Sequence, residues 1–251
     1  MTKKEYLKKL VSFAAQSDFV RQLPLEELGY SDDPVVNEFI FDNDLAFVYG
    51  LLFDQGMRSV DAWKSPFLLK KRLGSLDVLH ISRMDTENLT SILSQKKALH
   101  RYPKVMSRNL INASKTIVSD FSGNISRLWE DHRTIEDVRK NFLMLCGIGP
   151  KKADLALLML VRDRGVALEG CEQIGVAFDV HVSRVFLRSG FYTVLDKEEK
   201  NTLQNDISTL HALPALLGTA VWDIGRHYCH KSSPACDRCP LAEKCQKRIE
   251  R

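Results

Sequence analysis

Residues 145–154 read LCGIGPKKAD and lie between two stretches whose apolar residues recur at helical spacing. Gly147 and Gly149 bracket Ile148, which predicts a turn too tight for bulky side chains, with Ile148 inserted into the core. The turn leaves backbone N–H groups exposed beside the start of the next helix. Exposed amides and a helix dipole both favour an anion, so the turn is a candidate phosphate site. A simple tight connection between two helices is the alternative.

Helical signals extend along the chain on both sides of this turn. The expected helix starts are Asp33 with Pro34, Asp85, and Thr134 with Asp137 three residues on. Residues 151–161 are apolar nearly all round, which predicts a helix buried on every side. Alternating strand patterns and Asn-Gly or Asp-Gly hairpins are lacking. The sequence therefore predicts an all-α fold.

The composition is that of an ordinary globular protein. The 251 residues are 44% hydrophobic and 27% charged, which argues against a disordered or fibrous chain. The longest apolar run, residues 155–161, has 7 residues, far below the ~20 that a membrane-spanning helix needs. The first 16 residues lack a secretory apolar core. We therefore expect a cytoplasmic protein without a membrane span, in which the 6 cysteines are reduced or bound to metal.

Charge is unevenly distributed, although the formal net charge is only +4. Residues 88–119 carry 6 bases and no acid, and residues 63–76 carry 4 bases and no acid. Residues 18–44, in contrast, carry 8 carboxylates and the single base Arg21. This segregation predicts a positive surface that binds phosphates. Solvated helix faces are the alternative for any one stretch.

The pattern Leu145-x-Gly147-Ile148-Gly149-x-Lys151-x-Ala153 resembles the helix-hairpin-helix of the DNA glycosylase superfamily that includes endonuclease III and the 8-oxoguanine glycosylases. In bifunctional members the lysine two places after the second glycine is the nucleophile, and Lys151 stands there. The start of a helix and the like charge of Lys152 both disfavour an ammonium, which suits attack on the sugar C1′ and formation of a Schiff base. A surface lysine that touches phosphate is the alternative for Lys151. The resemblance also implies that Gly147, Ile148, Gly149 and Lys152 bind DNA.

The segment Phe178-Asp179-Val180-His181 resembles the family segment Val-Asp-Thr-His, which supplies the catalytic aspartate. Asp179 also suits the N-cap of the following helix. The buried side of that helix would carry Val182, Val185 and Phe186. A carboxylate held as an anion there would stabilise an oxocarbenium-like sugar, or orient Lys151 or a water. His181 is expected to be structural or to contact phosphate.

Four cysteines near the C-terminus have the spacing C-x6-C-x2-C-x5-C; they are Cys229, Cys236, Cys239 and Cys245. Zinc sites usually use two short Cys-x-x-Cys pairs, and only one is present. The spacing matches the [4Fe-4S] loop of the endonuclease III and adenine glycosylase branches. The resemblance implies a structural [4Fe-4S] cluster in a loop from which Lys244 and its basic neighbours reach phosphates.

Other matches extend the resemblance over most of the chain. Gln55 resembles the family glutamine that fills the gap left by an extruded base, with a solvent-facing residue at a helix end as the alternative. The stretch Tyr102-x-Lys104 resembles the start of a barrel helix, which makes Lys104 a candidate DNA ligand. The implied domains are a helical barrel with the hairpin at residues 33–170, and a cluster domain of residues 1–32 plus 171–251.

Four departures from the family pattern concern substrate identity more than reaction class. Cys146 replaces the usual hairpin proline, Pro150 directly precedes the lysine, Val180 replaces threonine, and extra residues within 162–177 separate the two candidate catalytic segments.

The resemblance implies a base-excision repair DNA glycosylase with associated AP (β-elimination) lyase activity. Its partner would be double-stranded DNA that contains damaged bases or abasic sites, with oxidised pyrimidines as the default by resemblance to endonuclease III. We expect a monomer that is associated with the nucleoid. One alternative is a monofunctional glycosylase for alkylated or otherwise modified bases, in which Asp179 activates water. Another is a non-catalytic DNA-binding protein that recognises damage or structure.

Overall fold

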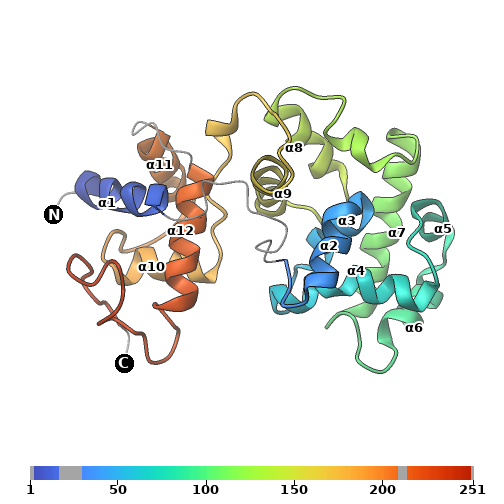
Figure 1. The fold of residues 1–251 in the computed structure, drawn as a ribbon, viewed down its shortest axis with the longest axis horizontal. Helices are drawn as coiled ribbons and strands as arrows, with labels where there is room; N and C mark the ends of the chain where they lie inside the picture. The colour runs from blue at the N-terminus through green and yellow to red at the C-terminus, as the bar shows by residue number, and fades with distance from the viewer. Residues whose placement is uncertain (1–2, 17–29, 209–213, 250–251) are drawn as a thin grey trace. The chain divides into compact units, whose positions relative to one another are not determined.

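The computed structural model describes residues 3–16, 30–208 and 214–249, and these ranges hold helices but no strand (Figure 1). The helices are α1 (Lys3–Gln16), α2 (Pro34–Asp42), α3 (Asp44–Phe53), α4 (Ser59–Leu73), α5 (Val78–Arg83), α6 (Thr86–Ser94), α7 (Pro103–Asp120), α8 (Ile135–Met144), α9 (Pro150–Arg162), α10 (Val180–Arg188), α11 (Lys197–Ser208) and α12 (Pro214–His227), with the short 3-10 helices η3 (Ile125–Leu128) and η4 (Cys171–Gln173). The predicted all-α class is confirmed. In the part of the chain that is described, no helix is long and apolar enough to cross a membrane.

The chain divides into two compact units. The first, here called the hairpin unit, lies within Leu23–Ala156. The second, the cysteine unit, combines Met1–Gln22 with Leu157–Arg251. Helix α9 begins in the hairpin unit and continues into the cysteine unit. The predicted domains, residues 33–170 and residues 1–32 plus 171–251, stay predictions.

The predicted capping residues begin three helices of the hairpin unit. Their side-chain oxygens accept backbone N–H groups at 2.7–3.3 Å: Asp33 from Val35, Asp85 from Asn88, and Thr134 from Asp137. The Thr134 hydroxyl also donates to the Asp137 carboxylate at 2.7 Å. Each cap satisfies an amide that has no partner inside its own helix. These helix starts are confirmed.

The core of the hairpin unit forms around α3, in which every residue from Leu45 to Phe53 is buried. Helices α2, α4 and α7 pack against it. The Tyr49 hydroxyl shares a 2.6 Å hydrogen bond with Ser114 Oγ, which joins α3 to α7. Because α3 is buried all round, the position of its C-terminal end is fixed by the core of this unit.

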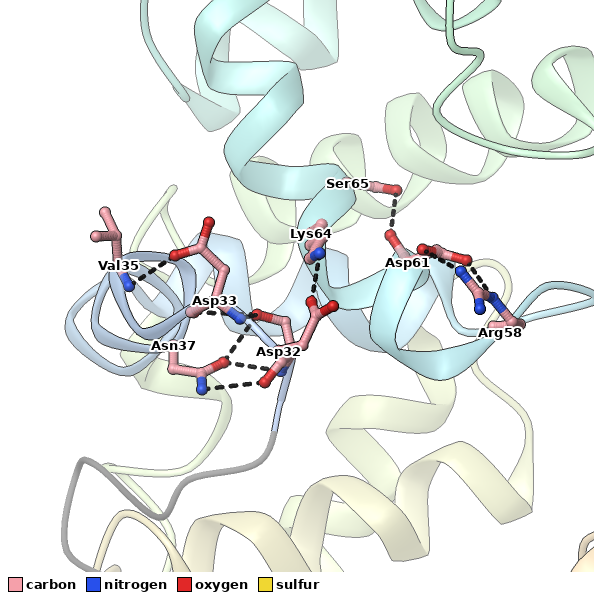
Figure 2. A network of polar contacts seen from close by, with 9 residues as sticks. Asp32, Asp33, Val35, Asn37, Arg58, Asp61, Lys64 and Ser65 are labelled. Atoms are coloured by element: carbon pink, nitrogen blue, oxygen red, sulfur yellow. Dashed lines mark hydrogen bonds and ion pairs between the residues drawn. The ribbon is translucent and has the colours of Figure 1, made fainter. Parts of the chain in front are cut away.

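An acidic residue before α2 meets a basic residue of α4 (Figure 2). Lys64 forms an ion pair with Asp32. The hydrogen bond that Lys64 donates in this pair lowers the pKa of the Asp32 carboxyl. Arg58 binds the Asp61 carboxylate through two hydrogen bonds, at 2.7 and 3.1 Å. Charges from the acidic stretch 18–44 and the basic stretch 63–76 therefore partly neutralise each other.

Arg72 has a structural role. Its guanidinium donates to four backbone carbonyls at and beyond the end of α6, at 2.6–3.3 Å; the acceptors belong to Ile92, Leu93, Lys96 and Lys97. Two of the four bases in residues 63–76, Lys64 and Arg72, are thus engaged within the protein. The positive surface predicted from this stretch is reduced to Lys70 and Lys71.

The cysteine unit has a core of its own. Helix α12 packs against α1 and α10. The core side chains include Leu7 and Leu10 from α1, Phe186 from α10, and Val221 and Ile224 from α12. In α9, residues 156–160 are all buried while its first turn is exposed at Lys151. The predicted helix is confirmed, but only its centre is buried on every side.

Candidate functional site

The turn between α8 and α9 has the predicted tight form. Ile148 is buried, with 6% of its surface exposed, and its N–H donates to the Leu145 carbonyl at 3.0 Å. Gly147 has a φ of +92°. A Cβ at Gly147 would lie 2.8 Å from Asn109 Nδ2 and 3.1 Å from Leu52 Cδ2, so a larger residue does not fit. Ile148 therefore anchors the turn in the core, and Gly147 allows its tight backbone.

Gly149 differs from Gly147. Its φ lies outside the left-handed region, and a Cβ added to it would meet no heavy atom of the described residues within 4 Å. The expectation that both glycines are needed for a tight turn is therefore wrong at Gly149. The space in front of this backbone is open at the start of α9, where exposed amides favour an anion. Residue 149 is the point at which a phosphate could approach the backbone.

The two lysines that follow have different surroundings. Lys151 is exposed on the first turn of α9. The Lys152 ammonium instead donates a 2.9 Å hydrogen bond to the carbonyl of Leu52 in α3. Burial lowers the pKa of Lys152 to about 8, with a further lowering by Lys151 and an opposing effect of Asp54. The structure thus turns Lys152 inward beside an exposed Lys151.

The turn that carries Gln55 is held through its backbone. The Gln55 N–H donates to the Phe53 carbonyl at 2.7 Å, and the Gln55 carbonyl lies 2.8 Å from His100 Nε2. His100 Nδ1 accepts the Tyr102 N–H at 3.0 Å, so the proton of the neutral ring is on Nε2 and is donated to Gln55. The Gln55 side chain is exposed.

Within the hairpin unit, three predicted segments are therefore brought together: the hairpin, the Gln55 turn and the chain just before α7. Lys104, on the first turn of α7, is exposed.

Asp179 is the N-cap of α10. Its Oδ1 accepts the N–H groups of His181 and Val182, both at 2.8 Å. The other oxygen, Oδ2, accepts no hydrogen bond from the described residues. The predicted buried side of the helix is confirmed, since it carries Val182, Val185 and Phe186. One carboxylate oxygen is thus fixed by the helix, and the side chain remains partly exposed.

Arg184 joins α10 to the first cysteine of the predicted metal site. Its guanidinium donates to the carbonyls of Gly225 at 2.8 Å and Cys229 at 2.6 Å. It also lies 3.0 Å from His181 Nδ1. Because arginine can only donate, Nδ1 is the acceptor in this pair. The His181 ring also packs edge-on against Trp222, so a structural role of His181 is evident in this unit.

The four predicted metal ligands line one open pocket; they are Cys229, Cys236, Cys239 and Cys245. All four are free thiols. Burial raises the pKa of the Cys239 and Cys245 thiols, and neighbouring cysteines raise it further. Thiolates at these positions would therefore be favoured by a bound metal. Over residues 3–16, 30–208 and 214–249, no three His, Cys, Asp or Glu side chains are arranged to hold a single metal ion.

Hydrogen-bond donors face this pocket. The Lys247 N–H donates to Cys245 Sγ at 3.3 Å, and Arg188 Nη1 lies 3.9 Å from Cys229 Sγ. Arg188 also donates to the carbonyls of His230 and Lys231, at 2.6 and 2.9 Å. Four thiols and N–H donors directed at sulfur fit a cluster held by thiolates. Lys244 is exposed in the same loop.

Solved structures with the same fold match nearly the whole chain. The structure of a trapped endonuclease III–DNA covalent intermediate (estranged-adenine complex) has a TM-score of 0.66 at 17% identity and covers 98% of this chain and 97% of its own. A non-covalent endonuclease III–DNA complex has a TM-score of 0.63 at 16% identity, with 98% and 96% covered. A thermostable thymine-DNA glycosylase has a TM-score of 0.59 at 14% identity, with 98% and 95% covered.

No family model and no curated protein matches the sequence. The likeness is one of fold, and it extends over both units of the chain. The chain therefore has the fold of the helix-hairpin-helix DNA glycosylase superfamily, as the motif of residues 145–153 predicted.

Proposed function

We propose that the protein is a base-excision repair DNA glycosylase with AP lyase activity on duplex DNA. The observation that carries this proposal is the hairpin: a turn anchored by Ile148, with open backbone at Gly149 and an exposed Lys151 on the next turn. Such a turn presents amides to a phosphate and an amine beside it. The protein would act as a monomer on nucleoid DNA in the cytoplasm.

The reaction begins with a damaged nucleotide turned out of the duplex. The neutral Lys151 amine attacks C1′, the bond from C1′ to the base breaks, and the base leaves with the bonding electrons and takes up a proton. The nitrogen then loses a proton, the C1′–O4′ bond breaks with its electron pair on O4′, and O4′ takes up a proton, which opens the sugar ring and leaves a Schiff base between Nζ and C1′. Removal of a C2′ proton then breaks the C3′–O bond and cleaves the strand.

Asp179 supports the first step of this reaction. Positive charge develops on the sugar as the base departs, and a carboxylate near C1′ lowers the energy of that state. The N-cap bonds to Oδ1 fix the orientation of the Asp179 side chain. Lys151 belongs to the hairpin unit and Asp179 to the cysteine unit. Their action on one nucleotide is therefore part of the proposal.

The thiols of Cys229, Cys236, Cys239 and Cys245 would hold a [4Fe-4S] cluster, which would cross-link the C-terminal loop. Replacing Cys236 with serine is expected to remove the iron and to lower Tm by roughly 10 °C, because a structural metal site contributes several kcal/mol to folding. Iron content and thermal melting measure both effects. Cys146→Ser is the matched control, since Cys146 is exposed at the hairpin. Equal iron in the two variants, or zinc in the purified wild type, would contradict the assignment.

The two hairpin glycines give a paired prediction. Gly149→Ala should leave Tm within about 1 °C of wild type but weaken DNA binding about tenfold, the size of one lost phosphate contact. Gly147→Ala should lower stability by about 1–3 kcal/mol, because its positive φ and its contact with Asn109 exclude a Cβ. Fluorescence anisotropy with an abasic-analogue duplex and thermal melting separate the two effects. Wild-type affinity in Gly149→Ala would refute phosphate binding at this turn.

The function itself is tested with duplex oligonucleotides that each hold one lesion: an oxidised pyrimidine, 8-oxoguanine, an alkylated purine or an abasic site. The proposal predicts base release followed by strand nicking, with oxidised pyrimidine as the default substrate. Base release without nicking would favour the monofunctional alternative. Tight binding without base release from any duplex would favour the non-catalytic alternative.

A further inference from the structure

We propose that Lys152 is a positioning residue, which holds the turn that carries Gln55 in a fixed relation to the turn that carries Lys151. This inference rests on the proposed function and on the predicted role of Gln55, which would fill the space left by the extruded base while Lys151 attacks the sugar. It gives Lys152 a role distinct from phosphate binding.

The contact lies at the end of α3. The last carbonyls of a helix have no partner inside the helix, and Leu52 is the second-last residue of α3. The Leu52 carbonyl receives the Lys152 ammonium at 2.9 Å across 100 residues of sequence. Gln55 follows only three residues later. One hydrogen bond therefore connects the first turn of α9 to the residues that lead into the Gln55 turn.

The charge of Lys152 strengthens this connection. Below about pH 8 the amine is protonated although it is largely buried. A charged donor makes a stronger hydrogen bond than a neutral one, and a cation is favoured at the C-terminal end of a helix dipole. Asp54 and Lys151 are the charged groups that act on it, with opposite effects. The buried ammonium thus stabilises the end of α3 where the Gln55 turn begins.

Other contacts hold the same turn and the end of α3. The His100 ring donates to the Gln55 carbonyl at 2.8 Å and is buried, with 3% of its surface exposed. Gly147 of the hairpin lies directly against the Leu52 side chain and Asn109. The backbone of the Gln55 turn is therefore held by hydrogen bonds while the Gln55 side chain is exposed. If Lys152 is lost, the connection to the first turn of α9 is lost with it.

The test compares Lys152→Met, which keeps the length of the side chain but removes its donor and charge, with Gln55→Ala and the double variant. Base extrusion is followed by the fluorescence of 2-aminopurine placed beside the lesion, and base release is measured on the same lesion DNA. Each single variant should slow base release about 10- to 100-fold, the loss of about 1.4–2.7 kcal/mol. The double variant should be no slower than Gln55→Ala alone, because both changes would disable the same function of Gln55.

The matched control is Lys140→Met, which removes an exposed lysine of α8 that pairs with Asp137 at 3.8 Å and should retain wild-type rates. Schiff-base trapping on DNA with a preformed abasic site should fall less than threefold in Lys152→Met, because Lys151 is intact and extrusion is easier there. If Lys152→Met does not fold, Lys152→Gln takes its place, since it retains a donor without the charge.

Effects that multiply in the double variant, or an unchanged rate of extrusion in Lys152→Met, would overturn the inference. Absence of base release by the wild type would contradict the proposed function instead. The fluorescence comparison then still decides the role of Lys152, because it needs only DNA binding.

Discussion

Replacing Lys151 with alanine is expected to abolish the borohydride-trapped adduct with lesion DNA and to slow strand nicking about 10³-fold or more. The reason is that the proposed intermediate is covalently bonded to this amine, so no Schiff base can form at residue 151 without it. Single-turnover nicking and gel analysis of trapped complexes measure both effects. Affinity for DNA should change little, since the hairpin amides remain.

The control for this variant is Lys140→Ala, in which an exposed lysine of α8 is removed from the same unit. It should form the adduct as wild type does. An undiminished adduct in Lys151→Ala would rule out Lys151 as the nucleophile. Failure of the wild type to form any adduct would rule out the lyase activity.

Replacing Asp179 with asparagine is expected to slow base release by about 10²–10⁴-fold, the range for loss of a charge that stabilises the transition state. Asparagine is as good an N-cap as aspartate, so the free energy of unfolding should change by only a few tenths of a kcal/mol. Rates on lesion DNA and thermal melting of the same preparation provide the comparison.

Asp179→Ala completes this test because it removes both the charge and the cap. It should lose base release to a similar extent and in addition about 1 kcal/mol of stability, a fall in Tm of roughly 2–4 °C. Only this variant would lose the hydrogen bonds that the N–H groups of His181 and Val182 donate to the capping side chain. If Asp179→Asn released bases at the wild-type rate, Asp179 would be a capping residue and nothing more.

Local signals predicted the fold well. The caps at Asp33, Asp85 and Thr134, the buried Ile148 and the buried face of α10 all depend on residues within a few positions of one another. Their hydrogen bonds and periodicity can therefore be read along the sequence. The resemblance of the hairpin to the glycosylase superfamily then supplied the architecture, which the solved structures confirm.

Contacts between distant parts of the chain could not be predicted in this way. The bond from Lys152 to Leu52 spans 100 residues, and the bond from His100 to the Gln55 carbonyl spans 45. Both depend on how helices pack, which the spacing of side chains in the sequence does not specify. The resemblance therefore implied DNA binding by Lys152, whereas the structure directs its ammonium to the Leu52 carbonyl.

The arginines of α10 and α4 illustrate the same limit. Arg184 and Arg188 lie four residues apart on α10. Arg184 donates to the carbonyls of Gly225 in α12 and of Cys229, and Arg188 donates to those of His230 and Lys231. Residues four apart lie on the same side of a helix, and these two lie opposite the apolar face of α10. That spacing is a sequence signal that could have indicated a shared structural role. Arg72 was predicted to lie on a phosphate-binding surface, but its guanidinium is used by the carbonyls after α6.

The proposed function depends above all on base removal through the amine of Lys151. The most direct test is peptide mapping of the adduct that borohydride traps on lesion-bearing duplex DNA, with fragment ions that distinguish neighbouring lysines. We expect a single modified residue, Lys151, joined through Nζ to C1′ of the sugar. An adduct on Lys152 or on another lysine, or no adduct at all, would contradict it.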